Sequence, residues 1–235
     1  MPNYLETIYF RDEFKETDYP QKLCNYIFEK YFKNNKSGNK LLDIGSGKGN
    51  HLVGFSRKGL DVFGIDKRKE CLEAVDKTFE IKECDLEKDA IPYESNTFDF
   101  IFSKSVIEHV RNADNFVSES NRVLKPGGIA IHMTPDWGTQ YKTFWDDYTH
   151  VQAWTRKSLQ NCMKMHDFDN VNCFLFRQLP ILWEYPFLSF LSDIVSILPE
   201  RFKWKDKNEE VFNTFIRFSK EKMLIGYGKK KEPSN

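Results

Sequence analysis

Short apolar runs recur along the first half of the chain, and most of them end in a polar or acidic residue. They span residues 41–44, 60–66, 81–86, 98–103 and 129–133. Continuous apolar runs of this length are typical of strands buried on both faces, as in parallel sheets. Helical patterns separate the runs. Strands that alternate with helices predict an α/β fold with a mostly parallel sheet.

Further elements flank this core on both sides. From Tyr19 onward, apolar residues recur at helical spacing, which predicts a helix followed by a polar loop at 34–39. The block 123–128 is typical of a helix end and a Pro-Gly-Gly turn that precede the fifth strand. Thr155 is a candidate N-cap for a later helix. Residues 223–227 are predicted to form the last strand.

Two segments stand outside this alternation. Residues 1–37 are rich in aromatic side chains and are predicted to be an N-terminal helical segment, with 38–235 as the main domain. The part before the helix either covers a ligand pocket as a lid or packs on the sheet edge. Residues 179–208 form a densely apolar insertion, broken by Pro186. It is interpreted as a helical cap over a substrate pocket, as an interfacial helix at 181–198 that contacts membrane, or as a dimer surface.

Composition and charge narrow the classes of partner. The 235 residues carry 35 basic and 35 acidic side chains, so no global positive field favours nucleic acid, and no nucleic acid partner is expected. The five cysteines show neither a CxxC pair nor a zinc-binding spacing, which suits a reducing compartment and predicts no metal site. No signal peptide pattern and no membrane-spanning run are found. We therefore expect a cytoplasmic protein, with peripheral membrane contact through 181–198 as an alternative and the oligomeric state open.

A glycine-rich turn after the first strand is the strongest local signal. The run ends in an acid, and glycines follow at every second position: Asp43, Gly45, Gly47 and Gly49. Glycine accepts positive φ and lets a ligand approach the backbone, so a nucleotide-like ligand is expected here, with a purely structural turn as the alternative. Asn50 stands where a dinucleotide fingerprint has its last glycine, and the residues around Lys48 do not form a Walker loop.

Two later strands also end in acids. Asp66 ends the second strand at the interval expected for a carboxylate that binds a ribose diol in a βαβ unit. Asp85 follows the third strand and could hold an exocyclic amine, with Leu86 against an adenine face. The alternatives are a solvated turn acid at Asp66 and a loop acid at Asp85.

The loop at 135–151 follows the fifth strand and combines aromatic residues, carboxylates and a histidine. Ligands of α/β sheets bind beyond the carboxyl ends of the strands, so this loop is assigned to the substrate side. His150 is the candidate proton acceptor because imidazole titrates near neutral pH, and Tyr148 is a second candidate. In the alternative interpretation both side chains only fix the loop. His109 is expected to begin or cap the helix after the fourth strand.

Three motifs then occur in order: Ile91-Pro92-Tyr93 through Asp99, Val106-Ile107-Glu108-His109-Val110, and Arg122 through Gly128. Together with the glycine turn, they resemble the class I S-adenosylmethionine-dependent methyltransferases, in the branch with quinone-biosynthesis and natural-product enzymes. The resemblance is strongest over 38–135. It implies a doubly wound, Rossmann-like sheet of seven strands with the last one antiparallel. It also implies S-adenosyl-L-methionine as cofactor and S-adenosyl-L-homocysteine as product.

By position, the resemblance assigns cofactor contacts to Asp43, Gly45, Gly47, Gly49, Asp66, Lys67, Asp85, Leu86 and Ser103. The implied activity is direct in-line methyl transfer to a small-molecule, glycan or lipid-linked acceptor, with base assistance from His150. Two other classes are weighed against it. A non-catalytic binding module would keep the scaffold and use the apolar insertion as its working surface. A nicotinamide-dependent oxidoreductase is disfavoured by the GxGxG spacing and the Pro-Gly-Gly block.

Overall fold

The computed structural model describes residues 18–35, 38–74, 78–199 and 214–232. A seven-stranded sheet in the order β3-β2-β1-β4-β5-β7-β6 organises the fold. Its strands are β1 (Lys40–Ile44), β2 (Asp61–Asp66), β3 (Glu80–Glu83), β4 (Phe98–Lys104), β5 (Leu124–Pro135), β6 (Phe168–Phe176) and β7 (Met223–Lys230). β1 to β5 pair in parallel, and β7 runs antiparallel to both β5 and β6. The predicted fold class is confirmed.

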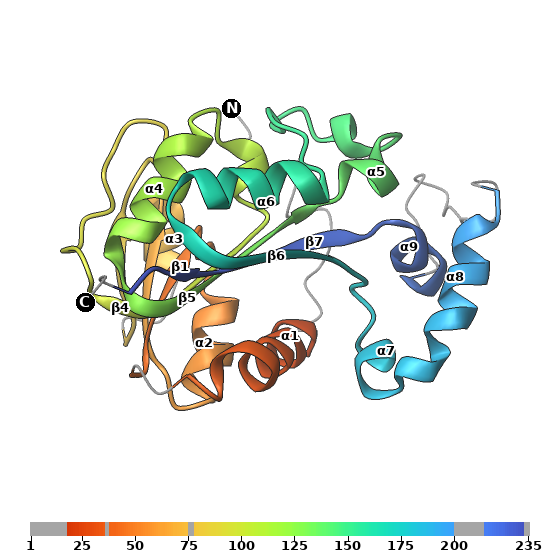
Figure 1. The fold of residues 1–235 in the computed structure, drawn as a ribbon, viewed down its shortest axis with the longest axis horizontal. Helices are drawn as coiled ribbons and strands as arrows, with labels where there is room; N and C mark the ends of the chain where they lie inside the picture. Colours follow the sequence, from red (N-terminus) through yellow and green to blue (C-terminus); the bar gives the residue numbers. More distant parts are fainter. Residues whose placement is uncertain (1–17, 36–37, 75–77, 200–213, 233–235) are drawn as a thin grey trace.

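Helices cover both faces of the sheet (Figure 1). α4 (Ala113–Val123) and α6 (Arg156–Met165) lie on one face, and α1 (Tyr19–Ile27) and α2 (Asn50–Ser56) lie on the other. The remaining helices are α3 (Lys69–Ala74), α5 (Trp137–Gln140), α7 (Pro180–Glu184), α8 (Ser189–Ile197) and α9 (Thr214–Lys220), with short helices η2 (Phe28–Phe32), η3 (Ile107–His109), η4 (Phe144–Asp146) and η5 (Pro186–Leu188).

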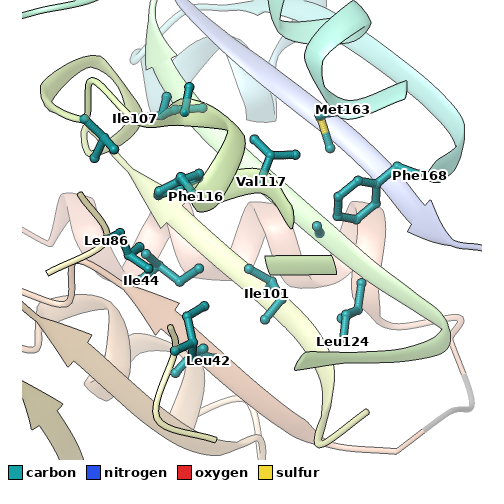
Figure 2. Close-up of a cluster of buried hydrophobic side chains, with 14 of the residues drawn as sticks. Leu42, Ile44, Leu86, Ile101, Ile107, Phe116, Val117, Leu124, Met163 and Phe168 are labelled. Carbon is teal, nitrogen blue, oxygen red and sulfur yellow. The ribbon is translucent and has the colours of Figure 1, made fainter. Parts of the chain in front are cut away.

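The first core layer lies between the sheet and α4 and α6. Figure 2 shows Phe116 and Val117 of α4 and Met163 of α6 directed toward the strands, where Ile101 and Leu124 meet them. Both helices have an N-cap whose side chain hydrogen-bonds to the first turn. The Asn112 side chain accepts from the Asn115 amide, and Thr155 forms a reciprocal cap with Ser158, as predicted for Thr155. Burial of such apolar side chains is worth roughly 1.5–3 kcal/mol each.

The second core layer lies under the opposite face and is largely aromatic. Phe32 stacks on Phe100 of β4 with ring centroids 4.5 Å apart, and Phe55 of α2 meets Phe102 edge-on at 5.1 Å. Leu23 of α1 completes the contact. The helix expected from Tyr19 is present, with proline at its first turn. The lid interpretation of 1–37 depends mostly on residues 1–17, which lie outside the described part of the chain.

The structure corrects several element boundaries. β3 ends at Glu83 and not after Asp85; the Cys84 amide donates the last hydrogen bond of the β2–β3 ladder, to the Asp66 carbonyl oxygen at 2.9 Å. β5 begins at Leu124 and takes in the Pro-Gly-Gly block, with a register shift opposite β4. β6 was not found from its pattern. It lies at the sheet edge, so polar and exposed positions interrupt its apolar residues.

The apolar insertion forms α7, η5 and α8, which gather with α9 at one end of the molecule (Figure 1). Trp183 stacks on Phe176 of β6, and Ser192 of α8 bonds Ser219 of α9 at 2.8 Å. Other large apolar side chains face solvent: Ile181, Tyr185, Phe187, Phe190, Leu191, Ile194 and Ile197. Residues 200–208 of the predicted insertion lie outside the described part. Among the described helices, none combines the length and apolar character that a membrane crossing requires.

Candidate active site

A cavity of about 360 Å³ opens at the carboxyl ends of β1, β2 and β4. Its volume falls in the range of small-molecule sites, and its position is the usual one for ligands of α/β sheets. The walls come from four places: the glycine turn, the end of β2, the turn after β3, and η3 with the loop that packs against it. None of the described residues of the apolar insertion lines it, which disfavours the pocket-cap interpretation of that insertion.

The glycine turn forms one wall. Gly45, Gly47 and Gly49 all have positive φ, between 52° and 78°. At Gly45 a Cβ atom would lie 2.4 Å from Val106 Cγ2, so the close approach of the turn to η3 requires glycine. The Gly45 amide donates to the Ile65 carbonyl oxygen at 2.8 Å, which joins the turn to the end of β2. Gly49 precedes α2 and does not line the cavity.

Asp66, the last residue of β2, lines the cavity next to the glycine turn. Its Oδ2 accepts from the Gly47 amide at 2.9 Å, and its Oδ1 accepts from the Arg68 amide at 3.0 Å. Asp66 and Lys67 both line the cavity. A carboxylate has about four lone-pair sites, so these two bonds fix its orientation and leave capacity for a diol.

Asp43 lies behind the wall. It is 1% exposed, and burial, reinforced by the nearby Asp66 charge, raises the pKa of its carboxyl well above the usual range. His51 Nδ1 lies 3.9 Å from Asp43 Oδ2, and burial lowers the pKa of this imidazole to about 3. His51 itself lines the cavity. Asp43 itself does not line the cavity, whereas its neighbours His51 and Asp66 do, and its cofactor contact stays a prediction.

The two residues predicted to contact the adenine, Asp85 and Leu86, are found in the same cavity wall. Asp85 and Leu86 both line the cavity, in the turn after β3. Asp85 Oδ1 accepts from the Glu87 amide at 3.2 Å, and Leu86 is almost fully buried. A short carboxylate next to an apolar wall is suited to an aromatic heterocycle with an exocyclic amine.

Ser103 differs from its predicted place. Its Oγ lies 2.9 Å from His132 Nδ1 inside the core, and it does not line the cavity. Alternation along β4 turns its side chain inward, and the next residues, Lys104 and Ser105, reach the cavity in its stead. Burial lowers the pKa of His132 to about 3, so the buried Ser103–His132 pair is neutral at physiological pH.

Glu108 belongs to η3, and its side chain is fully buried. Thr134 Oγ1 donates to its Oε2 at 3.0 Å, and its backbone oxygen accepts from the amides of Val151 and Gln152. Burial raises the pKa of the Glu108 carboxyl to about 7, partly offset by its hydrogen bonds and by Lys104. Glu108 is part of the motif at 106–110, but no role was predicted for it from the sequence.

The loop at 135–151 returns to η3 and brings two histidine rings together, with centroids 4.7 Å apart. His109 and Thr149 line the cavity, and His150 packs behind His109. His109 lies in η3, whereas Asn112 caps α4, so the expected helix-capping role of His109 was wrong. Neither His150 nor Tyr148 lines the cavity; His150 contacts the cavity residue His109, whereas the Tyr148 side chain is 77% exposed.

Comparisons with known proteins agree with this geometry. A family model described as a methyltransferase domain matches residues 15–172, more than half of the chain. The mouse mitochondrial ubiquinone biosynthesis O-methyltransferase is 34% identical over 102 residues, which cover 39% of this chain and 27% of that protein. Phosphoethanolamine N-methyltransferase 2 of Caenorhabditis elegans is 30% identical over 154 residues, which cover 62% of this chain and 35% of that protein. The chain thus spans about a third or less of the length of these two curated relatives.

Solved structures share the fold. An S-adenosylmethionine-dependent methyltransferase from Archaeoglobus fulgidus superposes with a TM-score of 0.65 at 17% identity, covering 97% of this chain and all of that one. Phosphoethanolamine N-methyltransferase 2 of Haemonchus contortus, in complex with S-adenosyl-L-methionine, superposes with a TM-score of 0.64 at 18% identity. That match covers 98% of this chain and 60% of the other. At these identities the likeness concerns the fold.

Proposed function

The chain belongs to the class I S-adenosylmethionine-dependent methyltransferases, and from this premise we propose that it methylates a small-molecule or lipid-linked acceptor. The observation that carries the proposal is the open cavity that Asp66, Asp85 and Leu86 line together with the glycine turn. The proposed contacts are the ribose diol on Asp66, with Lys67 beside it, and the adenine between Asp85 and Leu86. The glycine turn would carry the amino-acid part of the cofactor.

The proposed reaction is a single in-line displacement. The acceptor lone pair forms a bond to the methyl carbon while the carbon–sulfur bond breaks, and that electron pair neutralises the sulfonium. The acceptor proton, where there is one, passes to a base or to water. The protein mainly holds the three atoms in line, which can supply roughly 7–11 kcal/mol of the barrier reduction.

The acceptor is proposed to bind at the end of the cavity formed by His109 and Thr149. Thr149 belongs to the substrate-side loop at 135–151, so this end of the cavity joins that loop. The His150 Nδ1 atom lies 2.5 Å from the Phe144 carbonyl oxygen, so it must carry the proton, and Nε2 retains its lone pair. This tautomer suits His150 as a proton acceptor.

We expect His150→Asn to lower the methyl-transfer rate by about 10²-fold or more, the scale of a lost general base. Cofactor binding should change little, because His150 lies behind the acceptor end of the cavity. Tyr148→Phe should leave the rate within about twofold, because its ring faces solvent. The assay is labelled-methyl transfer to a small-molecule cell extract. Equal rates for the parent and His150→Asn would remove the proposed role.

The exposed face of α7, η5 and α8 supports the lipid-linked class of acceptor. Phe187, Phe190 and Ile197 are 73%, 61% and 82% exposed, and an apolar face of this kind suits a membrane interface. Replacing Phe187 and Phe190 with serine should reduce co-sedimentation with anionic liposomes at least about threefold. Trp183→Ser is a poor probe because that ring packs on Phe176. A parent protein that stays in the supernatant would exclude this surface role.

The activity itself is tested by incubating the protein with S-adenosylmethionine and cell extract and measuring S-adenosylhomocysteine. Accumulation that depends on both protein and extract supports an enzyme. Cofactor binding without product, across hydrophilic and lipid extracts, would instead support the non-catalytic scaffold.

A further inference from the structure

Three ligand-type side chains meet at the wall of the proposed acceptor end, where His109 lines the cavity and Glu108 and His150 lie behind it. Glu108 and His109 come from η3, and His150 comes from the substrate-side loop. One ligand-capable atom from each residue lies within 4.8 Å of the other two. Neither sequence spacing nor cysteine content predicted this cluster, because the loop joins η3 only in the folded chain.

Both imidazoles are held in the same tautomer. His150 Nδ1 faces the Phe144 carbonyl oxygen at 2.5 Å, and a carbonyl can only accept. His109 Nδ1 lies 2.9 Å from Thr149 Oγ1 and 3.3 Å from the Thr149 carbonyl oxygen. Thr149 Oγ1 gives its own proton to Asp147 Oδ1 at 2.6 Å, so it accepts from His109. Each ring therefore donates through Nδ1 and keeps the Nε2 lone pair, which is how proteins orient metal-binding histidines.

Glu108 adds an anionic ligand with spare capacity. Its side chain is fully buried, and Oε2 accepts from Thr134, whereas Oε1 has no hydrogen-bond partner among the described residues. A buried carboxylate oxygen without a partner costs free energy unless a proton donor or a cation reaches it. Lys104 lowers the pKa of the Glu108 carboxyl and Asp147 raises it, so the carboxyl has a basic and an acidic neighbour.

We propose that Glu108, His109 and His150 bind a divalent transition-metal ion of the zinc class beside the proposed methyl-transfer site. With Glu108 ionised, the two imidazole Nε2 lone pairs and the carboxylate oxygen all accept, and none of them donates to another. A cation satisfies all three at once. Two nitrogens and one oxygen suit Zn²⁺, Co²⁺, Fe²⁺ or Mn²⁺ better than Mg²⁺ or Ca²⁺, which prefer oxygen ligands.

The cluster needs only a small contraction to bind. Ligands at about 2.0–2.2 Å from Zn²⁺ lie roughly 3–4 Å from one another. Ligand atoms that are now up to 4.8 Å apart must therefore approach by roughly 1–2 Å at most. Three protein ligands leave at least one coordination position open, as in catalytic zinc sites. Because His109 lines the cavity, the open position is proposed to face the acceptor from that wall.

The role of the ion rests on the proposed function. An acceptor hydroxyl would take the open position as a ligand, and the ion would lower its pKa so that its proton leaves to water before transfer. The oxygen lone pair then forms the bond to the methyl carbon, and the carbon–sulfur pair goes to sulfur. In the ion-loaded enzyme His150 is a ligand and not the base. The acceptor class thereby narrows to molecules with an ionisable hydroxyl.

The test is a Co²⁺ titration of metal-free protein, followed by visible absorbance and calorimetry. We expect one ion per chain and d–d bands of a site with nitrogen and oxygen ligands. Glu108→Gln and, separately, His109→Asn should weaken binding at least about thirtyfold. Because Glu108 is buried, circular dichroism and thermal melting verify the fold of each variant. His109 is only half-buried, so His109→Asn keeps the test valid if Glu108→Gln does not fold.

The chain offers a matched control. Asp114, Cys162 and His166 form a second cluster with ligand spacing on α4 and α6, where His166 Nε2 already bonds Asp114 Oδ1 at 2.8 Å. His166→Gln should leave Co²⁺ binding unchanged. Binding that is absent in the parent, is lost in His166→Gln, or survives both cavity variants would overturn the proposal. Cofactor binding, titrated separately, distinguishes these outcomes from failure of the proposed methyltransferase function.

Discussion

Replacing Asp66 with alanine is expected to weaken S-adenosylmethionine binding at least about tenfold, or about 1.4 kcal/mol. Two effects add in the same direction. The ribose diol would lose a charged acceptor, and hydrogen bonds to charged groups contribute roughly 1.5–3 kcal/mol. The Gly47 and Arg68 amides would also lose their acceptor, so the glycine turn would be less well ordered before the ligand arrives. Calorimetric titration measures the change.

Asp61→Ala is the matched control for this variant. Asp61 is an exposed acid at the opposite end of the same strand and outside the cavity lining. Asp61→Ala changes the net charge by the same amount as Asp66→Ala, and it should leave the affinity for S-adenosylmethionine within about twofold of the parent value. Equal affinities for Asp66→Ala and the parent, with both proteins folded, would contradict the assignment of the ribose site to Asp66.

Replacing Gly45 with alanine should abolish measurable cofactor binding and lower the free energy of unfolding by about 2–4 kcal/mol. The new Cβ would lie 2.4 Å from Val106 Cγ2, and the φ of +73° disfavours a side chain independently of that contact. Either the turn or η3 must move, and both form walls of the cavity. Urea unfolding and calorimetry report the two losses.

Two further variants separate the clash from the backbone strain. Gly47→Ala has a positive φ but no atom within 4 Å of the added Cβ, so it should cost only about 1 kcal/mol. Val106→Ala in the Gly45→Ala background should recover part of the stability, because it removes the atom that the Cβ meets. Equal costs at Gly45 and Gly47 would show that close packing against η3 is not what requires the first glycine.

The cofactor half of the fold could be predicted because strict local rules govern it. Parallel strands buried on both faces show as apolar runs, and the turn after β1 needs glycine for conformational reasons, so Gly45 and Gly47 stand out in the sequence. Asp66 and Asp85 follow from their places at strand ends. The fold class is confirmed, and the cavity brings these acids together as the resemblance implied.

The other half depends on long-range packing that leaves little trace in the sequence. Ser103 was assigned to the cofactor, yet the pleat of β4 turns it toward His132 and sends Lys104 to the cavity. Glu108 and His150 become neighbours only because the loop amides of 151 and 152 bond back to the Glu108 carbonyl oxygen. The edge strand β6 was missed because one side of it is exposed and its pattern is irregular.

The central claim is that this cavity accepts an adenosyl sulfonium, and calorimetric titration of the parent protein tests it most directly. We expect S-adenosylmethionine and S-adenosylhomocysteine to bind with one site per chain and a Kd on the order of micromolar, about −8 kcal/mol. NAD should bind at least about a hundredfold more weakly, because Asn50 replaces the last glycine of a dinucleotide fingerprint. No heat with either sulfur ligand, or tighter binding of NAD, would contradict the account.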